Sequence, residues 1–314
     1  MRSLGATGLP ISPLGLGLAA LGRPGYINLG HAGDVGDTDV GAMERHAHSV
    51  LDAAYEGGVR YFDAARSYGR GEAFLASWLT DRGHDVTVGS KWGYTYTAGW
   101  RVDAEDHEIK DLSVDTLRRQ LGETRALLGD RLALYQIHSA TLESGVLDDG
   151  AVREELARLR ETGVFVGFTA TGPRQTDTIE RALEVGGFDA VQATWNLHER
   201  SAGAALAAAH EAGLGVIVKE ALANGRLTAR GDGAGALAES ARERDTTPDA
   251  LALAAVLAQP WVGVVLSGAA TVDTLRSNLA ALSVAWDAEL DERLAPLTEP
   301  AEEYWERRSA LAWN

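Results

Sequence analysis

The sequence predicts an α/β fold, a closed (β/α)8 TIM barrel formed by a single domain over residues 1–314. Short apolar runs alternate with amphipathic helical patterns from one end of the chain to the other. Eight such runs can be counted, and no low-complexity linker divides the sequence. Eight strands that are each followed by a helix favour a closed barrel over an open doubly wound sheet.

The eight apolar runs have the composition of parallel strands covered on both faces. Stretches such as GVIV and VGVVLSG are continuously apolar, as expected for strands that lie between a barrel interior and surrounding helices. The predicted strands span residues 13–18, 59–64, 86–92, 132–138, 164–170, 190–196, 215–221 and 262–268.

Helix signals lie between these runs. Ser113 precedes one amphipathic pattern and is a predicted N-cap, and Gly163 follows another and is a predicted C′ residue. Thr247 and Pro248 predict a helix start with proline at the first helical position. A further helix is predicted to begin at Thr271, with an apolar face formed by Leu275, Leu279 and Leu282.

Composition excludes several classes of function. No apolar stretch approaches the roughly 20 residues that span a bilayer, and the N-terminus lacks signal-peptide features, so we expect a cytoplasmic protein without a membrane partner. The chain has no cysteine, which excludes disulfides, thiolate nucleophiles and metal–thiolate sites. Its formal net charge is −16 and it has no run of Lys and Arg, so nucleic acid is not an expected partner. Nothing in the sequence indicates an oligomeric state.

Three consecutive predicted strands end in an ionisable residue. Asp63 ends the second, Lys91 the third and His138 the fourth, and Tyr68 follows Asp63 in the next turn. Since barrel active sites lie at the carboxyl ends of strands, these four side chains can converge at one mouth. Each residue alone has a structural alternative. Asp63 could cap a turn, Lys91 could be a surface lysine, His138 could be a hydrogen-bonded structural histidine, and Tyr68 could serve packing alone. Their occurrence together, in this order, favours catalysis.

These four side chains suit the donation of a proton to an oxygen atom. A tyrosine normally has a pKa near 10, and we expect the Lys91 ammonium to lower the pKa of Tyr68 by stabilising its phenolate. Asp63 would hold the ammonium, and His138 would orient a carbonyl through a hydrogen bond. Carbonyl reduction needs such a donor because the oxygen becomes an alkoxide.

The segments around these residues resemble the aldo-keto reductase family. YFDAARSYG, SKWG and YQIHS are similar to its Asp-Tyr-Lys-His tetrad, and LGATGLPISPLGLG is similar to its N-terminal β-hairpin and first strand. VQATWNL, VIVKEALANGRL and LSGAATVDTLRSNLAAL resemble its last three strands and last helix, so the resemblance covers essentially the whole chain. It implies reduction of a small-molecule aldehyde or ketone by hydride transfer from NAD(P)H, with Tyr68 as general acid.

The resemblance also implies a site for the nicotinamide cofactor. No metal site is expected, because a metal-dependent hydrolase needs clustered His and carboxylates at strand ends and only His138 is plainly at one. Gln192 would bind the nicotinamide carboxamide, the loop from Lys219 to Arg230 would cover the pyrophosphate, and the start of the last helix would hold the adenosine. The implied cofactor contacts are Gly17, Gln192, Trp195, Lys219, Leu222, Asn224, Arg226, Ser267, Gly268, Ala269 and Asn278.

The sequence departs from the family pattern at three places that bear on the cofactor. Thr169-Ala170 replace the usual Ser-Asn, and Lys219 replaces an aromatic residue that often stacks on the nicotinamide, a role open to Trp195 or Trp92. The basic residue that NADP-preferring members place after the eighth strand is missing from residues 268–275, and Arg276 is the nearest. The family still implies NADP(H), with NAD(H) as the alternative.

Other functions remain open. The chain could be an NAD-linked sugar (aldose) dehydrogenase that runs in the oxidative direction, or a non-enzymatic redox sensor that binds the nicotinamide. A Schiff-base enzyme using Lys91 or Lys219 would leave the Asp63–Tyr68 spacing unexplained.

The substrate pocket is expected from segments outside the barrel repeat, which are residues 22–40, 95–112 and 224–235 and the tail from about Leu297. Aromatic residues in or near these segments form either a pocket wall or ordinary core, and they are Trp92, Tyr94, Tyr96, Trp100, Trp305 and Trp313.

Overall fold

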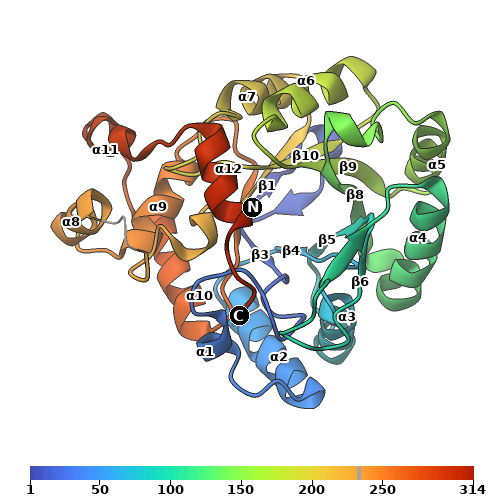
Figure 1. Cartoon of the computed structure of the whole chain (residues 1–314), viewed down its shortest axis with the longest axis horizontal. Coiled ribbons are helices and arrows are strands. Elements are labelled where there is room, and N and C mark those ends of the chain that lie inside the picture. The colour runs from blue at the N-terminus through green and yellow to red at the C-terminus, as the bar shows by residue number, and fades with distance from the viewer. Residues whose placement is uncertain (232–234) are drawn as a thin grey trace.

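A computed structural model describes residues 1–231 and 235–314 and shows a closed barrel of parallel strands surrounded by helices (Figure 1). The strands neighbour one another in the order β10-β11-β12-β3-β4-β5-β8-β9, and the last pairs with the first. The predicted (β/α)8 barrel is therefore confirmed. Its strands are β3 (Leu14–Gly17), β4 (Tyr61–Asp63), β5 (Thr87–Trp92), β8 (Leu132–Ala140), β9 (Phe165–Ala170), β10 (Ala190–Thr194), β11 (Gly215–Lys219) and β12 (Val264–Ser267).

The helices follow the strands and begin where the capping signals predict. Ser113, Thr247 and Thr271 each accept a hydrogen bond from a backbone N–H of the first turn. The predicted position of Leu282 is wrong, because α10 ends at Leu279 and the Leu282 side chain is exposed. The helices are α1 (His31–Val35), α2 (Val40–Glu56), α3 (Gly71–Arg82), α4 (Val114–Leu128), α5 (Gly150–Glu161), α6 (Gln175–Val185), α7 (Gly203–Glu211), α8 (Gly235–Glu243), α9 (Pro248–Leu257), α10 (Val272–Leu279), α11 (Ala288–Leu294) and α12 (Ala301–Ser309).

An N-terminal hairpin closes one end of the barrel, as predicted. Strands β1 (Arg2–Ser3) and β2 (Pro10–Ile11) pair antiparallel, and Leu4 and Ile11 pack into the apolar barrel interior. Gly5 has a φ of +53°, and a Cβ there would lie 2.4 Å from the backbone nitrogen of Gly215. A glycine is required at this position because both the backbone conformation and the close approach exclude a side chain.

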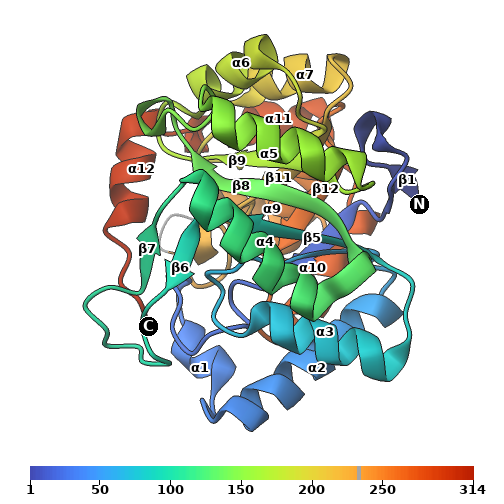
Figure 2. The ribbon, with the colours of Figure 1, turned by 90° about the vertical axis from the view of Figure 1, so that its right-hand side faces the viewer.

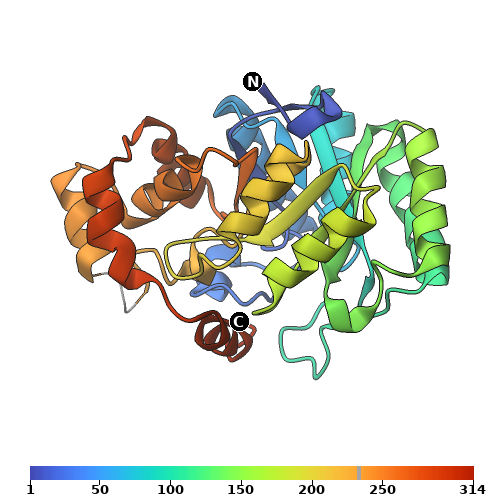
Figure 3. The ribbon, with the colours of Figure 1, turned by 90° about the horizontal axis from the view of Figure 1, so that it is seen from above.

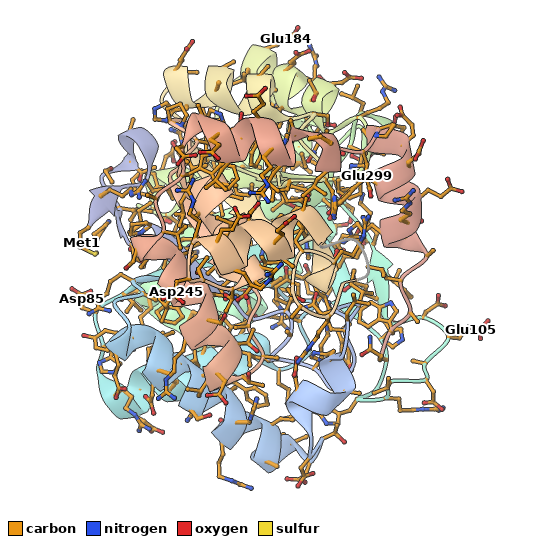
Figure 4. The ribbon with its side chains drawn as sticks, turned by 90° about the vertical axis from the view of Figure 1, so that its left-hand side faces the viewer. Met1, Asp85, Glu105, Glu184, Asp245 and Glu299 are labelled. Atoms are coloured by element: carbon orange, nitrogen blue, oxygen red, sulfur yellow. The ribbon has the colours of Figure 1, made fainter. Side chains whose placement is uncertain are left out.

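The opposite end of the barrel carries the segments outside the repeat. A second antiparallel hairpin, β6 (Tyr94–Tyr96) and β7 (Glu108–Lys110), lies there beside the C-terminal tail, away from β1 (Figures 2 and 3). Met1 and Asp85 accordingly lie on one side of the molecule and Glu105 and Glu299 on the other (Figure 4). Among the described residues, no helix combines the length and the apolar character that crossing a membrane requires.

Candidate active site

A cavity of about 600 Å³ opens at the carboxyl ends of the barrel strands. This volume is typical of a small-molecule site. Most residues predicted for the site line the cavity, namely Gly17, Asp63, Tyr68, His138, Gln192, Lys219, Leu222, Asn224, Ser267, Gly268, Ala269 and Asn278.

Lys91 lies behind the cavity wall and joins two of its residues. The Lys91 ammonium donates hydrogen bonds to the Asp63 carboxylate, to the carbonyl oxygen of Ala64 at 3.0 Å and to the Tyr68 hydroxyl at 3.2 Å. Its side chain is 1% exposed. A charge this deeply buried needs close partners, and here those partners hold the ammonium directly against the phenol.

Asp63 is held from several sides. Its Oδ1 accepts hydrogen bonds from the Tyr61 hydroxyl at 3.2 Å and from the amides of Gln192 at 3.3 Å and Gln136 at 3.4 Å. Asp63 lies two residues after Tyr61 on β4 and therefore points to the same face, the barrel interior. The carboxylate is thus fixed and leaves the ammonium little freedom to move.

The pKa of Tyr68 is raised, whereas the sequence predicted that Lys91 would lower it. Burial of the phenol raises this pKa most, the Asp63 carboxylate adds to it, and the Arg23 guanidinium opposes both. Asp63 neutralises part of the Lys91 charge at close range, so the ammonium offsets only part of the cost of desolvating the phenolate. Tyr68 therefore carries its proton at neutral pH.

His138 is kept neutral beside Tyr68. Burial, followed by the charges of Lys91 and Lys219, lowers the pKa of His138 well below its usual value. The two rings meet edge to face with centroids 5.7 Å apart. The residue after it, Ser139, has a φ of +55° and donates its N–H to Thr169 Oγ1 at 2.6 Å. This irregularity in β8 directs His138 toward the cavity, as bulges near active sites commonly do.

A second buried charge cluster lines the cavity after β11. Burial lowers the pKa of Lys219 to about 8, and its ammonium donates to Thr194 Oγ1 at 3.2 Å. Glu220 accepts two-pronged hydrogen bonds from Arg308 of α12, 2.6 to 3.0 Å long. Burial opposes ionisation of Glu220, but Arg308 and Lys219 outweigh it and lower its pKa to about 2. The cavity wall is therefore charged on this side.

The far end of the cavity is polar and holds a buried amide, Asn278, beside the carboxylate of Asp249. Asn278 Nδ2 donates to Asp249 at 2.7 Å, and its Oδ1 accepts from the Ser267 hydroxyl at 2.7 Å. These two bonds fix the orientation of the amide. Asp249 of α9, Ser267 of β12 and Thr274 near the start of α10 line the cavity beside it, where the sequence predicted an adenosine contact.

Two loops meet over the middle of the cavity. Arg230 donates two hydrogen bonds of 2.6 Å to Asp34, and the Asn224 amide donates to Asn28 Oδ1 at 3.3 Å. Asn224 has a φ of +55°, and its Oδ1 is buried without a partner among the described residues. Strained backbone and an unsatisfied buried acceptor are typical of a ligand site. Of the predicted pocket segment 224–235, residues 232–234 lie outside the described part of the chain.

Two predicted cofactor contacts do not line the cavity. β10 ends at Thr194, and the next residue, Trp195, points outward and packs against the Trp261 ring at 5.8 Å. Arg226 instead pairs with Glu299 in the tail. The structure brings neither to the cavity.

The aromatic residues divide between wall and core. Tyr94 and Trp313 line the cavity. Trp92 and Trp305 are buried in hydrophobic clusters, and Trp100 packs edge to face against Phe74. Tyr96 is half-buried and does not line the cavity.

Sequence reasoning missed several residues that line the cavity. Arg23, Tyr26 and Glu108 reach it from the two long segments that were expected to shape the pocket. Asp249 and Arg308 reach it from α9 and α12. The sequence indicated only which segments would shape the pocket. It could not indicate single residues, because no periodicity identifies which side chain of an irregular loop points inward.

Comparison with known proteins agrees with this geometry. The model of the Aldo/keto reductase family matches residues 13–295. The chain belongs to the aldo-keto reductase family. Together with its oxidoreductase-named relatives, this makes the protein an NAD(P)-dependent oxidoreductase.

Individual relatives are distant but match over much of their length. The chain is 27% identical to the "Uncharacterized oxidoreductase YqkF" of Bacillus subtilis, over 89% of this chain and 90% of that one. It is 26% identical to a D-threo-aldose 1-dehydrogenase from a Pseudomonas species, over 71% and 69% of the two chains. The holo form of aldo-keto reductase AKR11C1 from Bacillus halodurans superposes with a TM-score of 0.75 at 22% identity, covering 97% and 98% of the chains. That last likeness shows the fold.

Proposed function

We propose that this aldo-keto reductase interconverts a small-molecule carbonyl and the corresponding alcohol, with Tyr68 as the proton donor. The observation that carries the proposal is the Lys91 ammonium, which bonds both the Asp63 carboxylate and the Tyr68 hydroxyl. Tyr68 and His138 both line the cavity. This arrangement supplies a fixed, protonated phenol and a neutral imidazole to an incoming oxygen atom.

The proton moves along a short path in this mechanism. A nicotinamide cofactor, when bound, would supply or accept the hydride. Tyr68 Oη would give its proton to the carbonyl oxygen, and the Lys91 ammonium at 3.2 Å would stabilise the phenolate that is left. The neutral His138 ring would hydrogen-bond the same oxygen and set the direction of the carbonyl. Asp63 would keep the ammonium in place.

The residues that line the cavity fit a dinucleotide. Gln192 would hold the carboxamide near the tetrad, Asn224 and its loop would cover the centre, and Ser267 and Asn278 would hold the adenosine. The family implies NADP(H), but the far end favours NAD(H). Arg276 does not line the cavity there; its side chain is 72% exposed and pairs with Asp273.

The direct test measures consumption of NADH and NADPH in parallel with an activated aromatic aldehyde as acceptor. We expect consumption with wild type and none above background with Tyr68→Phe. Tyr94→Phe is a matched control, because it removes a hydroxyl from another tyrosine of the same cavity. Tight nucleotide binding without turnover on any carbonyl would contradict the proposal and favour a redox sensor.

A second candidate is oxidation of a sugar hemiacetal. It is favoured by the charged side chains around the tetrad, because sugar hydroxyls pair with carboxylates and guanidinium groups. These residues are Arg23, Glu108, Glu220 and Arg308. The relative named D-threo-aldose 1-dehydrogenase is consistent with this candidate. Reduction of oxidised nucleotide by aldoses, at rates above those with simple alcohols, would support it.

A further inference from the structure

Arg23 is a buried cation directly beside the proposed acid. It lies in the loop after β3, and its side chain is 3% exposed. The guanidinium carbon lies 5.3 Å from the ring centroid of Tyr68, 5.0 Å from that of Tyr26 and 4.6 Å from that of Trp313. A cation at this distance from an aromatic ring is attracted to it, and more strongly where water is excluded.

The guanidinium is fixed in this position. Its Nη1 donates to the carbonyl oxygen of Ser67 at 3.0 Å and to Glu108 Oε2 at 2.9 Å. Ser67 immediately precedes Tyr68, so this bond ties Arg23 to the backbone that carries the acid. The Nε atom is buried and has no partner among the described residues. An incompletely satisfied buried cation is costly, and this cost would be offset by a role at the site.

Several charged or titratable groups face Tyr68 from the elements packed around it. Burial and the carboxylates raise the pKa of Tyr68, and the Arg23 guanidinium lowers it. Lys91 is already partly neutralised by Asp63, with which it forms a buried ion pair. The groups around the phenol are Asp63, Lys91, His138, Arg23, Glu108, Glu220 and Tyr26.

We propose that Arg23 is a positioning residue that acts through Tyr68, as a second cation beside Lys91 that stabilises the negative charge left when Tyr68 gives up its proton. Glu108 holds Arg23 in place and moderates its effect. This inference rests on the proposed function of Tyr68.

Removing the positive charge of Arg23 should make Tyr68 a weaker acid. The measurement is kcat for alcohol oxidation with saturating oxidised nucleotide between pH 6 and 10. Because burial raises the pKa of Tyr68, the phenolate fraction stays small over this range and kcat should rise with pH along a limb. We expect Arg23→Met to displace this limb upward by about one pH unit, a fall of about tenfold at a fixed pH. Arg23→Lys, which keeps the charge, should recover at least half of the displacement.

The opposite change at Glu108 separates electrostatics from a structural role. Glu108→Gln removes a negative charge near Tyr68, and Arg23 is still held by Ser67. We expect it to displace the limb downward and to raise the rate at a fixed pH about two- to fivefold. The matched control is Arg60→Met. Arg60 also lies over a tyrosine, 3.9 Å from the Tyr55 centroid, but it precedes β4, away from the cavity, and its loss should leave the profile unchanged.

The outcomes distinguish this inference from the proposed function. Displacements of opposite sign at Arg23 and Glu108, with unchanged nucleotide affinity, would support it. It would be overturned if both variants were slower to the same extent and Arg23→Lys restored nothing, or if Arg23→Met kept the wild-type profile. If Tyr68→Phe retained activity, the function of Tyr68 would fail as well.

Discussion

The two ends of the cavity differ in their chemistry. The tetrad end holds buried charges, with the Lys91 ammonium paired to Asp63 and the Arg23 guanidinium over the ring of Tyr68. The far end holds an oriented neutral amide, Asn278, between Asp249 and Ser267. Charges in a dry site change the proton affinity of a neighbour, whereas fixed hydrogen-bonding groups select a ligand. Turnover and nucleotide affinity should therefore respond to different residues.

The largest loss at the tetrad end short of removing the acid is expected from Lys91→Met. The phenolate loses its nearest cation, so kcat should fall by about a hundredfold or more. The variant should also lose about 3–5 kcal/mol of unfolding free energy, because Asp63 is left buried without its ion partner. Urea unfolding and steady-state kinetics measure the two effects.

A double variant separates these two effects. Asp63→Asn with Lys91→Met removes both charges, so the unfolding free energy should return toward wild type while kcat stays low. Recovery of activity together with stability would show that Lys91 acts only through the fold.

A smaller and different effect is expected at the far end. Asn278→Ala removes one oriented amide, and we expect nucleotide binding to weaken roughly two- to tenfold with kcat at saturation nearly unchanged. Arg276→Ala, on the same helix but exposed, is the control and should leave the affinity for NADH unchanged. A selective loss of NADPH affinity in Arg276→Ala would contradict the inferred preference for NAD(H). Fluorescence titration with both nucleotides decides this.

A further effect, on stability and not on turnover, is expected at His31, the first residue of α1, in the segment after β3 that contributes to both ends. His31 is fully buried, neither ring nitrogen has a partner among the described residues, and burial lowers its pKa to about 4. The unfolded chain binds this proton below about pH 6.5 and the folded chain does not. Stability is therefore complete above pH 6.5 and lost as the pH falls toward 4. Between pH 7.5 and 5.0 the loss should be about 1–2 kcal/mol. His31→Phe should remove this part of the pH dependence in urea unfolding.

The barrel and the convergence of the tetrad could be predicted from the sequence because both follow from strand periodicity. Residues two apart on a strand share a face, so Tyr61 places Asp63 in the interior. The same rule would have excluded Trp195, which differs in parity from Gln192 and so points to the outer face.

The remaining site residues depend on contacts between distant segments. Arg23 meets Glu108 and Trp313 only because a loop, a hairpin and the tail fold over one mouth. No local pattern encodes that meeting. The pKa of Tyr68 was also mispredicted, because the sequence does not give the burial of the phenol, which raises this pKa most.

The most direct test of the central assignment compares Tyr68→Phe with Tyr94→Phe in a single turnover. Each enzyme is saturated with reduced nucleotide and mixed with aldehyde while the reduced-nicotinamide absorbance is followed. We predict that Tyr68→Phe binds the nucleotide as wild type does and oxidises it about a thousandfold more slowly, whereas Tyr94→Phe stays within a few-fold of wild type. A wild-type rate in Tyr68→Phe would contradict the assignment of Tyr68 as the acid.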